Sequence, residues 1–282
     1  MREFNFIVEK IFIGVTVQDF LKKQGVSKEI IKKVKFGGVF LNGKTLSNLK
    51  GLVNYKDQVK IVLPKEEKNP FIKLVSGDLT VLYEDEYLLA VDKPSGIMVH
   101  ASKSGAPSFD ALVLGYLEPS VKVFRAITRL DKDTSGVVLV AKDEFTASLL
   151  SENLKKGDFK KTYEAVVKGA PTEKIFTVEK PIKRLSEKGM ERVIDQNGKY
   201  AKTIFSLIKN LDNGLSLIKA EPVTGRTHQI RVHLKSVNLP LYADALYGDR
   251  VEGKTFTLIA KELEFTHPHT KKRIKVTSKI EI

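Results

Sequence analysis

Asp131 is the residue whose type and surroundings most suggest chemistry. It stands in the segment AITRLDKDTSGVVLVAK (126–142), close to Arg129 and ahead of a Thr-Ser-Gly turn that leads into an apolar strand. A carboxylate in a loop beside a cation can act as a nucleophile or as a base, because the cation keeps it ionised. The commonest task of an Asp in a loop is to cap a turn. Read by itself, the segment favours the turn cap.

A second segment, EPVTGRTHQIRVHLKSVN (221–238), gathers polar side chains around a predicted helix start. Apolar residues at helical spacing predict a buried face, and Thr227 is the predicted N-cap. Arg231 then lies in the first turns of the helix, and Arg226 lies just before it. Guanidinium groups at a helix start suit the recognition of phosphate or carboxylate. A solvated helix start would explain the arginines but not their occurrence with a glycine and two histidines.

Several other chemistries lack support in the sequence. The absence of cysteine excludes disulfides, thiol catalysis and thiolate zinc sites. Neither a phosphate-binding glycine loop nor a Gly-x-Ser-x-Gly nucleophile motif occurs. His267 and His269 form a His-x-His pair, which we interpret as a surface turn because no further ligand lies nearby in sequence. We therefore expect no metal and no cofactor.

The charge of the chain indicates a polyanionic partner. The 282 residues carry a formal charge of +14. Residues 1–75 hold 15 Lys and Arg against 7 Asp and Glu (+8), and the rest of the chain holds 33 against 27 (+6). A basic excess of this size is typical of proteins that bind nucleic acid. Its concentration in the first quarter predicts a polyanion-binding module there.

The first quarter also has the pattern of a small α/β unit. Residues 17–25 and 27–36 are spaced as two short helices, the second capped by Ser27. The segment GVFLNGKTL (38–46) predicts a hairpin with an Asn-Gly turn, and DQVKIVLP (57–64) predicts a closing strand.

One stripe of the second helix is basic. Lys28, Lys32 and Lys35 recur along it and could contact phosphates. An ordinary appendage with solvated lysines is the alternative interpretation.

The remainder of the chain predicts a different architecture. After a polar, proline-bounded segment at 64–78, strand-like runs outnumber helical ones and do not alternate with them regularly. This arrangement favours an α+β fold with a mixed, largely antiparallel sheet over a doubly wound one. We expect two domains, residues 1–75 with a core at 12–63, and residues 76–282.

Taken together, the motifs of the larger part resemble the RluA family of pseudouridine synthases. The resemblance covers roughly residues 78–280. It rests on VDKPSGIMVH (91–100), RLDKDTSG (129–136), KTYEAVVKG (161–169), GRTHQIRVH (225–233) and a Leu-Tyr-Gly ending at 246–248. The basic helix followed by GGVFLNGK (37–44) resembles the S-four-type RNA-binding domain, a module that also occurs before this catalytic domain in the family.

This resemblance implies a pseudouridine synthase fold and the cofactor-free isomerisation of uridine to pseudouridine in RNA. It makes Asp131 the catalytic carboxylate and Arg231 its ion-pair partner beneath the base. Tyr163 would stack on the uracil and is a candidate for the final proton removal.

The resemblance also implies residues that would contact RNA. Arg129 would fill the space left by the flipped uridine. Lys93 and Arg226 are weaker candidates, for phosphate contacts or for structural roles.

One position departs from the family pattern. Members usually carry His immediately before Arg-Leu-Asp, and this chain has Thr128. A non-catalytic RNA-binding or ribosome-assembly protein that retains the fold is therefore the alternative. A nucleoside glycosidase has less support, because Asp133 is the one nearby carboxylate and its spacing says little about geometry.

The expected substrate is RNA, with large-subunit ribosomal RNA favoured by the N-terminal module and transfer RNA as the alternative. The sequence shows no signal-peptide pattern and no apolar window long enough for a membrane span. We expect a cytoplasmic protein, with a monomer as the default.

Overall fold

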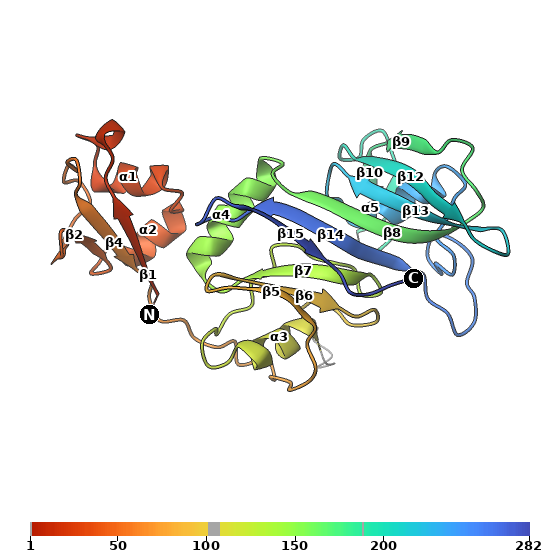
Figure 1. Ribbon diagram of the computed structural model, residues 1–282, viewed down its shortest axis with the longest axis horizontal. Coiled ribbons are helices and arrows are strands. Elements are labelled where there is room, and N and C mark those ends of the chain that lie inside the picture. The colour runs from red at the N-terminus through yellow and green to blue at the C-terminus, as the bar shows by residue number, and fades with distance from the viewer. Residues whose placement is uncertain (1, 101–107, 188) are drawn as a thin grey trace.

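The computed structural model describes residues 2–100, 108–187 and 189–282. Two separate main sheets organise these residues, and they belong to an N-terminal unit (residues 2–63) and a C-terminal unit (residues 81–282) (Figure 1). Among the described residues, no helix has the length and the apolar run needed to cross a membrane.

The N-terminal unit is a four-stranded antiparallel sheet, in the order β1-β4-β2-β3, with two short helices. Its elements are β1 (Glu3–Ile7), the 3-10 turn η1 (Lys10–Phe12), α1 (Val17–Lys23), α2 (Lys28–Val34), β2 (Val39–Leu41), β3 (Lys44–Thr45) and β4 (Gln58–Val62). Strand β1 lies before the expected core at 12–63, and its pairing with β4 adds an edge strand to the predicted unit.

Local sequence explains both helices and the hairpin of this unit. The hydroxyl of Ser27 accepts a hydrogen bond from the Ile30 backbone at 3.3 Å, so the predicted N-cap of α2 is confirmed. Asn42 and Gly43 form the β2–β3 turn with φ of 50° and 81°, as the Asn-Gly pair predicts. The apolar face of α2 is buried, whereas its lysines at 28, 32 and 35 are exposed.

The C-terminal unit is built on a nine-stranded mixed sheet in the order β5-β6-β7-β14-β8-β13-β12-β9, with β15 paired to β14. Neighbours are antiparallel except β7 and β14, which pair in parallel over two residues. The predicted α+β class with a largely antiparallel sheet is confirmed. The strands are β5 (Val81–Glu84), β6 (Leu88–Lys93), β7 (Ser135–Ala141), β8 (Lys160–Lys168), β9 (Ile175–Glu179), β12 (Lys202–Asn210), β13 (Leu215–Pro222), β14 (Leu258–Thr266) and β15 (Arg273–Thr277).

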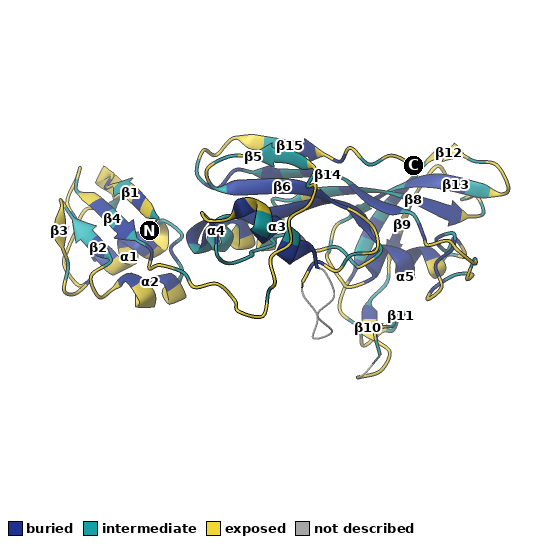
Figure 2. Ribbon diagram, turned by 90° about the horizontal axis from the view of Figure 1, so that it is seen from below, coloured by how far each residue is buried: buried dark blue, intermediate teal, exposed yellow. Residues whose placement is uncertain are grey.

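In the described part of this unit, three helices and a small hairpin complete the fold. They are α3 (Phe109–Leu117), α4 (Glu144–Lys155), α5 (Gln229–Lys235) and the paired strands β10 (Ile182–Arg184) and β11 (Arg192–Ile194). Figure 2 shows α5 and the β10–β11 hairpin on the same side of the sheet.

The sheet is buried because helices cover its apolar faces. Helix α3 packs on one face of β6 and β7 through a cluster that includes Phe109, Val113 and Val138. The other face of these strands packs against α4 and the β14–β15 pair, with Phe265 fully buried. Helix α5 packs on the half of the sheet formed by β8, β12 and β13.

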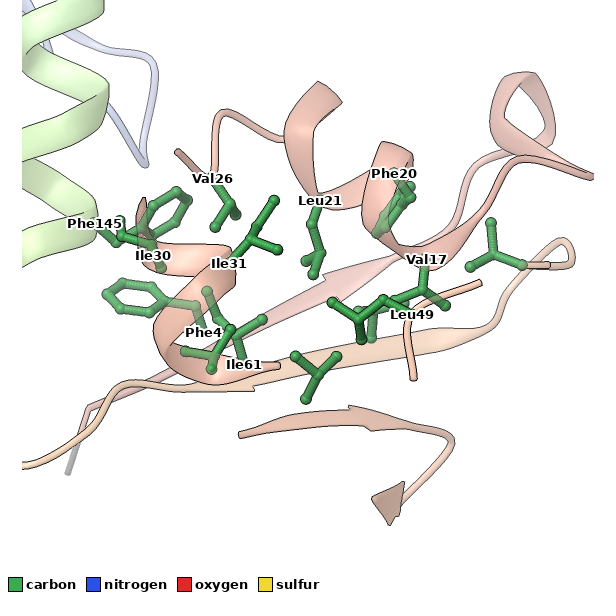
Figure 3. Close-up of a cluster of buried hydrophobic side chains, with 14 of the residues drawn as sticks. Phe4, Val17, Phe20, Leu21, Val26, Ile30, Ile31, Leu49, Ile61 and Phe145 are labelled. Carbon is green, nitrogen blue, oxygen red and sulfur yellow. The ribbon is translucent and has the colours of Figure 1, made fainter. Parts of the chain in front are cut away.

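The two units share a hydrophobic core. Phe145, from α4 of the C-terminal unit, is 2% exposed and lies within the N-terminal cluster, 4.8 Å from the Phe4 ring (Figure 3). Arg2 forms an ion pair with Asp143, and Lys33 pairs with Glu144 at 2.6 Å. Both apolar packing and charge pairing therefore hold α4 against the N-terminal unit.

Candidate active site

The loop that carries Asp131 is tied to strand β7. Ile127 donates its backbone N–H to the Leu139 carbonyl at 2.7 Å, and the buried hydroxyl of Thr128 accepts the Leu139 N–H at 3.0 Å. The turn that follows is closed by the Asp131 backbone carbonyl, which accepts from the Thr134 N–H at 3.2 Å. Among the described residues, no hydrogen bond ties the Asp131 carboxylate to this turn, so the side chain does not act as the cap that local sequence favoured.

Lys93 supports this loop from below. Its side chain is 0% exposed, and its ammonium group donates to the carbonyls of Pro94, Ile97 and Lys132 at 2.8–2.9 Å. Burial lowers the pKa of Lys93 to about 8, although the nearby Asp133 and Asp131 act in the opposite direction. The ammonium group is not accessible to solvent. The expected contact of Lys93 with an RNA phosphate is therefore wrong, and its role is structural.

Gly136 fixes where the loop enters the sheet. Its φ is +107°, which L side chains rarely adopt, and a β-carbon there would lie 2.7 Å from the Ala260 backbone nitrogen. Gly136 pairs with Ala260 at the short parallel contact between β7 and β14. A side chain at position 136 would therefore push the loop away from β14.

Arg231 projects from α5 and is held mainly by a carboxylate that the sequence analysis did not assign. Asp244 is fully buried and accepts from Arg231 Nε at 2.8 Å and from Nη2 at 2.7 Å. The guanidinium carbon also lies 4.8 Å from the centre of the Tyr247 ring and 4.4 Å from that of Phe256. Burial alone would lower the pKa of Arg231, but the bonds to Asp244 outweigh it and raise the pKa. Arg231 is thus a fixed cation.

The remaining guanidinium nitrogen faces the loop. Arg231 Nη1 lies 3.8 Å from Asp131 Oδ2, within the range of an ion pair. The Asp131 side chain is 31% exposed, so it lies at the surface of the site with the cation beneath it. The structure brings together these two residues, which are separated by one hundred positions in sequence.

Helix α5 starts differently from the prediction. It begins at Gln229, Thr227 is exposed, and the residue at the N-cap is His228, in the left-handed conformation (φ 57°, ψ 18°) with no side-chain cap bond. The predicted cap at Thr227 is therefore wrong. The Gln229 amide oxygen accepts the Arg226 backbone N–H at 2.9 Å and so ties the preceding turn to the start of the helix.

The left-handed turn directs His228 into the site. Its Nε2 lies 3.8 Å from Asp131 Oδ2, and its Nδ1 lies 2.8 Å from the Tyr247 hydroxyl. Burial lowers the pKa of His228, and Arg231 acts in the same direction, while Asp131 opposes them. These surroundings therefore favour the neutral imidazole.

Tyr163 reaches the site through strand register. On β8 it pairs with Ala260 of β14, the same residue that pairs with Gly136 of β7. Two interstrand spacings, roughly 10 Å, thus separate Tyr163 from the start of β7. Burial raises the pKa of the Tyr163 phenol, and the Asp131 charge raises it further. The phenol is therefore neutral, and it lies close enough to Asp131 for the charge of the carboxylate to affect its pKa.

The two remaining arginines lie on the surface. Arg129 is exposed, two residues before Asp131. Arg226 is also exposed, and its Nε donates to the Tyr200 carbonyl at 2.9 Å. Both are accessible to a polyanion next to the site.

The other histidines have structural partners. His267 is fully buried and accepts the His269 and Thr270 N–H groups at its Nδ1, so the expected surface turn is corrected to a buried one. His269 lies between the two units and contacts the Thr146 hydroxyl at 2.9 Å. Across the described ranges, no three His, Cys, Asp or Glu side chains gather in a way that could hold a metal ion.

Sequence reasoning missed three residues of the site, Asp244, His228 and Tyr247. A signal existed for Asp244, which is an acidic residue in the otherwise mostly apolar stretch LPLYADALYG (239–248). A buried acid of this kind requires a partner. His228 and Tyr247 lie within motifs that the sequence shows, but their roles follow only from their mutual contact.

Comparison with protein families matches residues 87–236, more than half of the chain, to the RNA pseudouridylate synthase family. The chain belongs to this family, and its relatives place it among the RluA-type synthases that its motifs indicate. It is an RNA pseudouridine synthase, an isomerase.

Relatives and solved structures agree with this assignment. The Bacillus subtilis protein named uncharacterized RNA pseudouridine synthase YjbO is 33% identical, over 93% of this chain and 94% of the relative. Ribosomal large subunit pseudouridine synthase C of Escherichia coli is 34% identical, over 91% of this chain and 86% of the relative. The structure of human RNA pseudouridylate synthase domain containing 1 matches with a TM-score of 0.59 and 25% identity, covering 75% of this chain and 85% of that chain.

Proposed function

We propose that this synthase converts one or more uridines of large-subunit ribosomal RNA into pseudouridine. Several relatives that match most of the chain are named ribosomal large subunit pseudouridine synthase C. The charge of +14 suits a large folded RNA, because each neutralised phosphate adds to affinity. From this substrate we infer a cytoplasmic location.

The observation that carries the mechanism is the position of Asp131 beside a fixed cation at the surface of the site. The reaction breaks the bond between ribose and a uracil nitrogen and rejoins ribose to a uracil carbon, so no atom is gained or lost. An ionised carboxylate can attack the sugar or the base, or can abstract a sugar proton. We assign this task to Asp131, with Arg231 keeping the carboxylate ionised when an apolar base covers it.

Tyr163 is proposed to stack on the uracil and to take part in removing the proton from the uracil carbon that has joined the ribose. Burial and the charge of Asp131 both raise the pKa of its phenol. The phenol is therefore neutral while it stacks on the base.

The exposed basic residues are proposed to hold the RNA. Arg129, on the loop of Asp131, would occupy the space that the flipped uridine leaves in its stack. Arg226 would contact a neighbouring phosphate. In the N-terminal unit, which we propose to be an S-four-type RNA-binding domain, the exposed lysines of α2 would contact the backbone at a distance from the target base.

Thr128 does not favour the alternative of a non-catalytic protein. Its hydroxyl accepts the Leu139 N–H at 3.0 Å and so fastens the loop that carries Asp131 to β7. The position that departs from the family pattern thus supports the site.

Mapping of pseudouridine in all cellular RNA, with and without the gene for this protein, tests the proposal. We expect specific large-subunit sites to lose pseudouridine in the deletion strain and to regain it with the wild-type gene but not with Asp131→Asn. Loss confined to transfer RNA would refute the proposed substrate. Equal restoration by Asp131→Asn would mean that Asp131 is not the catalytic carboxylate.

A further inference from the structure

We propose that His228 is a positioning residue that donates Nε2–H toward the Asp131 carboxylate, and that Tyr247 fixes the tautomer required for this. The proposal rests on the assignment of Asp131 as the catalytic carboxylate. A series of polar contacts then runs from Arg192 of β11 through Tyr247 and His228 to Asp131.

The order of the hydrogen bonds in this series determines where the imidazole proton lies. The Arg192 backbone N–H donates to the Tyr247 hydroxyl oxygen at 2.8 Å. The Tyr247 hydroxyl proton is then free for its other neighbour, His228 Nδ1, at 2.8 Å. A phenol that donates to Nδ1 makes this nitrogen an acceptor, so the proton of the neutral ring is on Nε2.

The Nε2–H group faces the carboxylate. His228 Nε2 and Arg231 Nη1 each lie 3.8 Å from the same oxygen, Asp131 Oδ2. A hydrogen bond requires an approach of about 1 Å, which the partly exposed loop of Asp131 can make when a base covers it. The opposite tautomer would direct a lone pair at a carboxylate, which is repulsive.

The surroundings keep the ring neutral. Burial lowers the pKa of His228, Arg231 and Arg192 lower it further, and the carboxylates of Asp131 and Asp244 act in the opposite direction. A neutral donor orients Asp131 without adding a second full positive charge beside Arg231. The ring can thus fix the direction of the carboxylate as a neutral group.

The backbone at His228 is consistent with a positioned side chain. A left-handed conformation is unfavourable for a non-glycine residue, and His228 adopts it with φ of 57° directly before α5. The ring is 8% exposed and packs edge-on against Tyr247. This conformation turns the imidazole out of the helix direction and toward the loop of Asp131.

Two variants separate positioning from folding. Tyr247→Phe retains the ring beside Arg231 and removes the hydroxyl that fixes the tautomer. His228→Asn retains a residue type that tolerates the left-handed conformation and replaces the imidazole by a shorter amide donor. The control is Tyr116→Phe, which removes an exposed hydroxyl of α3 that bonds to Glu84 of β5.

The experiment combines nitrogen-15 spectra of the histidine rings with single-turnover kinetics on a ribosomal RNA transcript. We expect His228 to be neutral with the proton on Nε2 at pH 7.5, and Tyr247→Phe to show a mixture of tautomers. The rate constant should fall about tenfold or more in Tyr247→Phe and His228→Asn, with unchanged RNA affinity and no change in the control.

A charged ring or a proton on Nδ1 in the wild type would overturn the proposal. Rate constants equal to that of the wild type in both variants would also overturn it. The tautomer is measured without substrate, so a wrong assignment of Asp131 is recognised separately, by wild-type turnover in Asp131→Asn.

Discussion

Arg231 lies between two carboxylates that use it differently. Asp244 binds it through two hydrogen bonds of 2.7–2.8 Å, whereas Asp131 lies 3.8 Å away and remains partly exposed. Asp244 fixes the position of the guanidinium group. Asp131 is attracted by its positive charge but forms no hydrogen bond with it. Arg231 therefore supplies charge to the site, and the direction of the Asp131 carboxylate is left to the proposed hydrogen bond from the neutral His228 ring.

Asp131→Asn should reduce pseudouridine formation by about 10²–10⁴-fold or more, because the amide can neither attack nor accept the proton. RNA affinity should stay within about threefold, since no positive charge is lost. Single-turnover assays and filter binding measure the two quantities. Asp133→Asn, the same change two residues further along the loop, is the matched control and should keep near-normal turnover. Comparable loss in both variants would mean that loop charge matters and not Asp131 itself.

Tyr163→Phe should retain stacking and slow the removal of the carbon-bound proton. We expect RNA affinity near that of the wild type and product formation reduced about 10²-fold, the contribution of one acid–base group. Release of tritium from carbon 5 of labelled uridine measures this step. Tyr163→Leu should weaken both affinity and turnover. A Phe variant with full tritium release would limit Tyr163 to stacking.

At the scale of elements, the site depends on one short parallel contact. Strands β7 and β14 pair over two residues only, and the loop of Asp131 enters β7 at that point. Because β14 also pairs with β8, this contact places the loop in one row with Tyr163. A sheet that is otherwise antiparallel thus aligns two catalytic candidates from separate parts of the sequence.

Gly136→Ala should destabilise this contact and displace the loop. The φ of +107° and the overlap of the new β-carbon with the Ala260 backbone together should cost about 1–3 kcal/mol or more. Urea unfolding and turnover are the measurements. Gly214→Ala is the matched control, because Gly214 also has a positive φ (+69°) but has open space around it. Equal losses of stability in both variants would contradict a steric role for β14.

The basic stripe of α2 provides a test of the N-terminal unit. Replacing Lys28, Lys32 and Lys35 by Gln should lower RNA affinity and reduce the slope of log affinity against log salt by about 2–3, if each lysine neutralises one phosphate. The fold should persist, because all three side chains are exposed. Turnover at saturating RNA should be unchanged.

A matched triple variant at exposed lysines elsewhere controls for net charge. Lys155, Lys174 and Lys209 are exposed on the C-terminal unit, and their replacement removes the same charge. An equal loss of slope in both triple variants would mean that overall charge, and not α2, binds the RNA.

At the scale of the whole molecule, the two units share a hydrophobic core and are packed against each other. Phe145 fills a place among the N-terminal side chains, and Tyr87 and Leu149 pack against the same cluster. Deleting residues 1–63 would expose this apolar surface. Substitutions on α2 are therefore a cleaner test of RNA binding than truncation.

His269 should make this shared core sensitive to acid. Burial lowers its pKa to about 4 from 6.5, with Asp143 opposing and His267, Lys271 and Arg2 reinforcing the shift. The folded state favours the neutral ring, so the stability it contributes is complete above pH 6.5 and is lost as the pH falls toward 4. The loss should reach up to about 3 kcal/mol.

Urea unfolding between pH 7.5 and pH 4.5 measures this effect against His269→Phe. The Phe ring can keep the stacking on Phe4 and Tyr87 but does not titrate. We expect the stability of the variant to depend less on pH than that of the wild type. Identical pH dependence would show that His269 does not link protonation to folding.

Several features of this protein follow from the sequence alone. The two helices and the hairpin of the N-terminal unit depend on caps, turn residues and periodicity within ten residues, such as Ser27 at α2 and Asn42-Gly43 at the hairpin. The α+β class and most strands follow from the same short-range patterns. The spaced motifs indicated the family and the reaction, and the comparisons confirmed both.

Only the tertiary structure decided which side chains meet. Asp244 binds Arg231, His228 turns toward Asp131, and Lys93 is buried beneath the loop and does not face RNA. These contacts depend on strand register, on a left-handed turn and on packing between segments far apart in the chain. Local spacing cannot encode them, because the free energy that fixes them comes from burial and pairing across the whole fold.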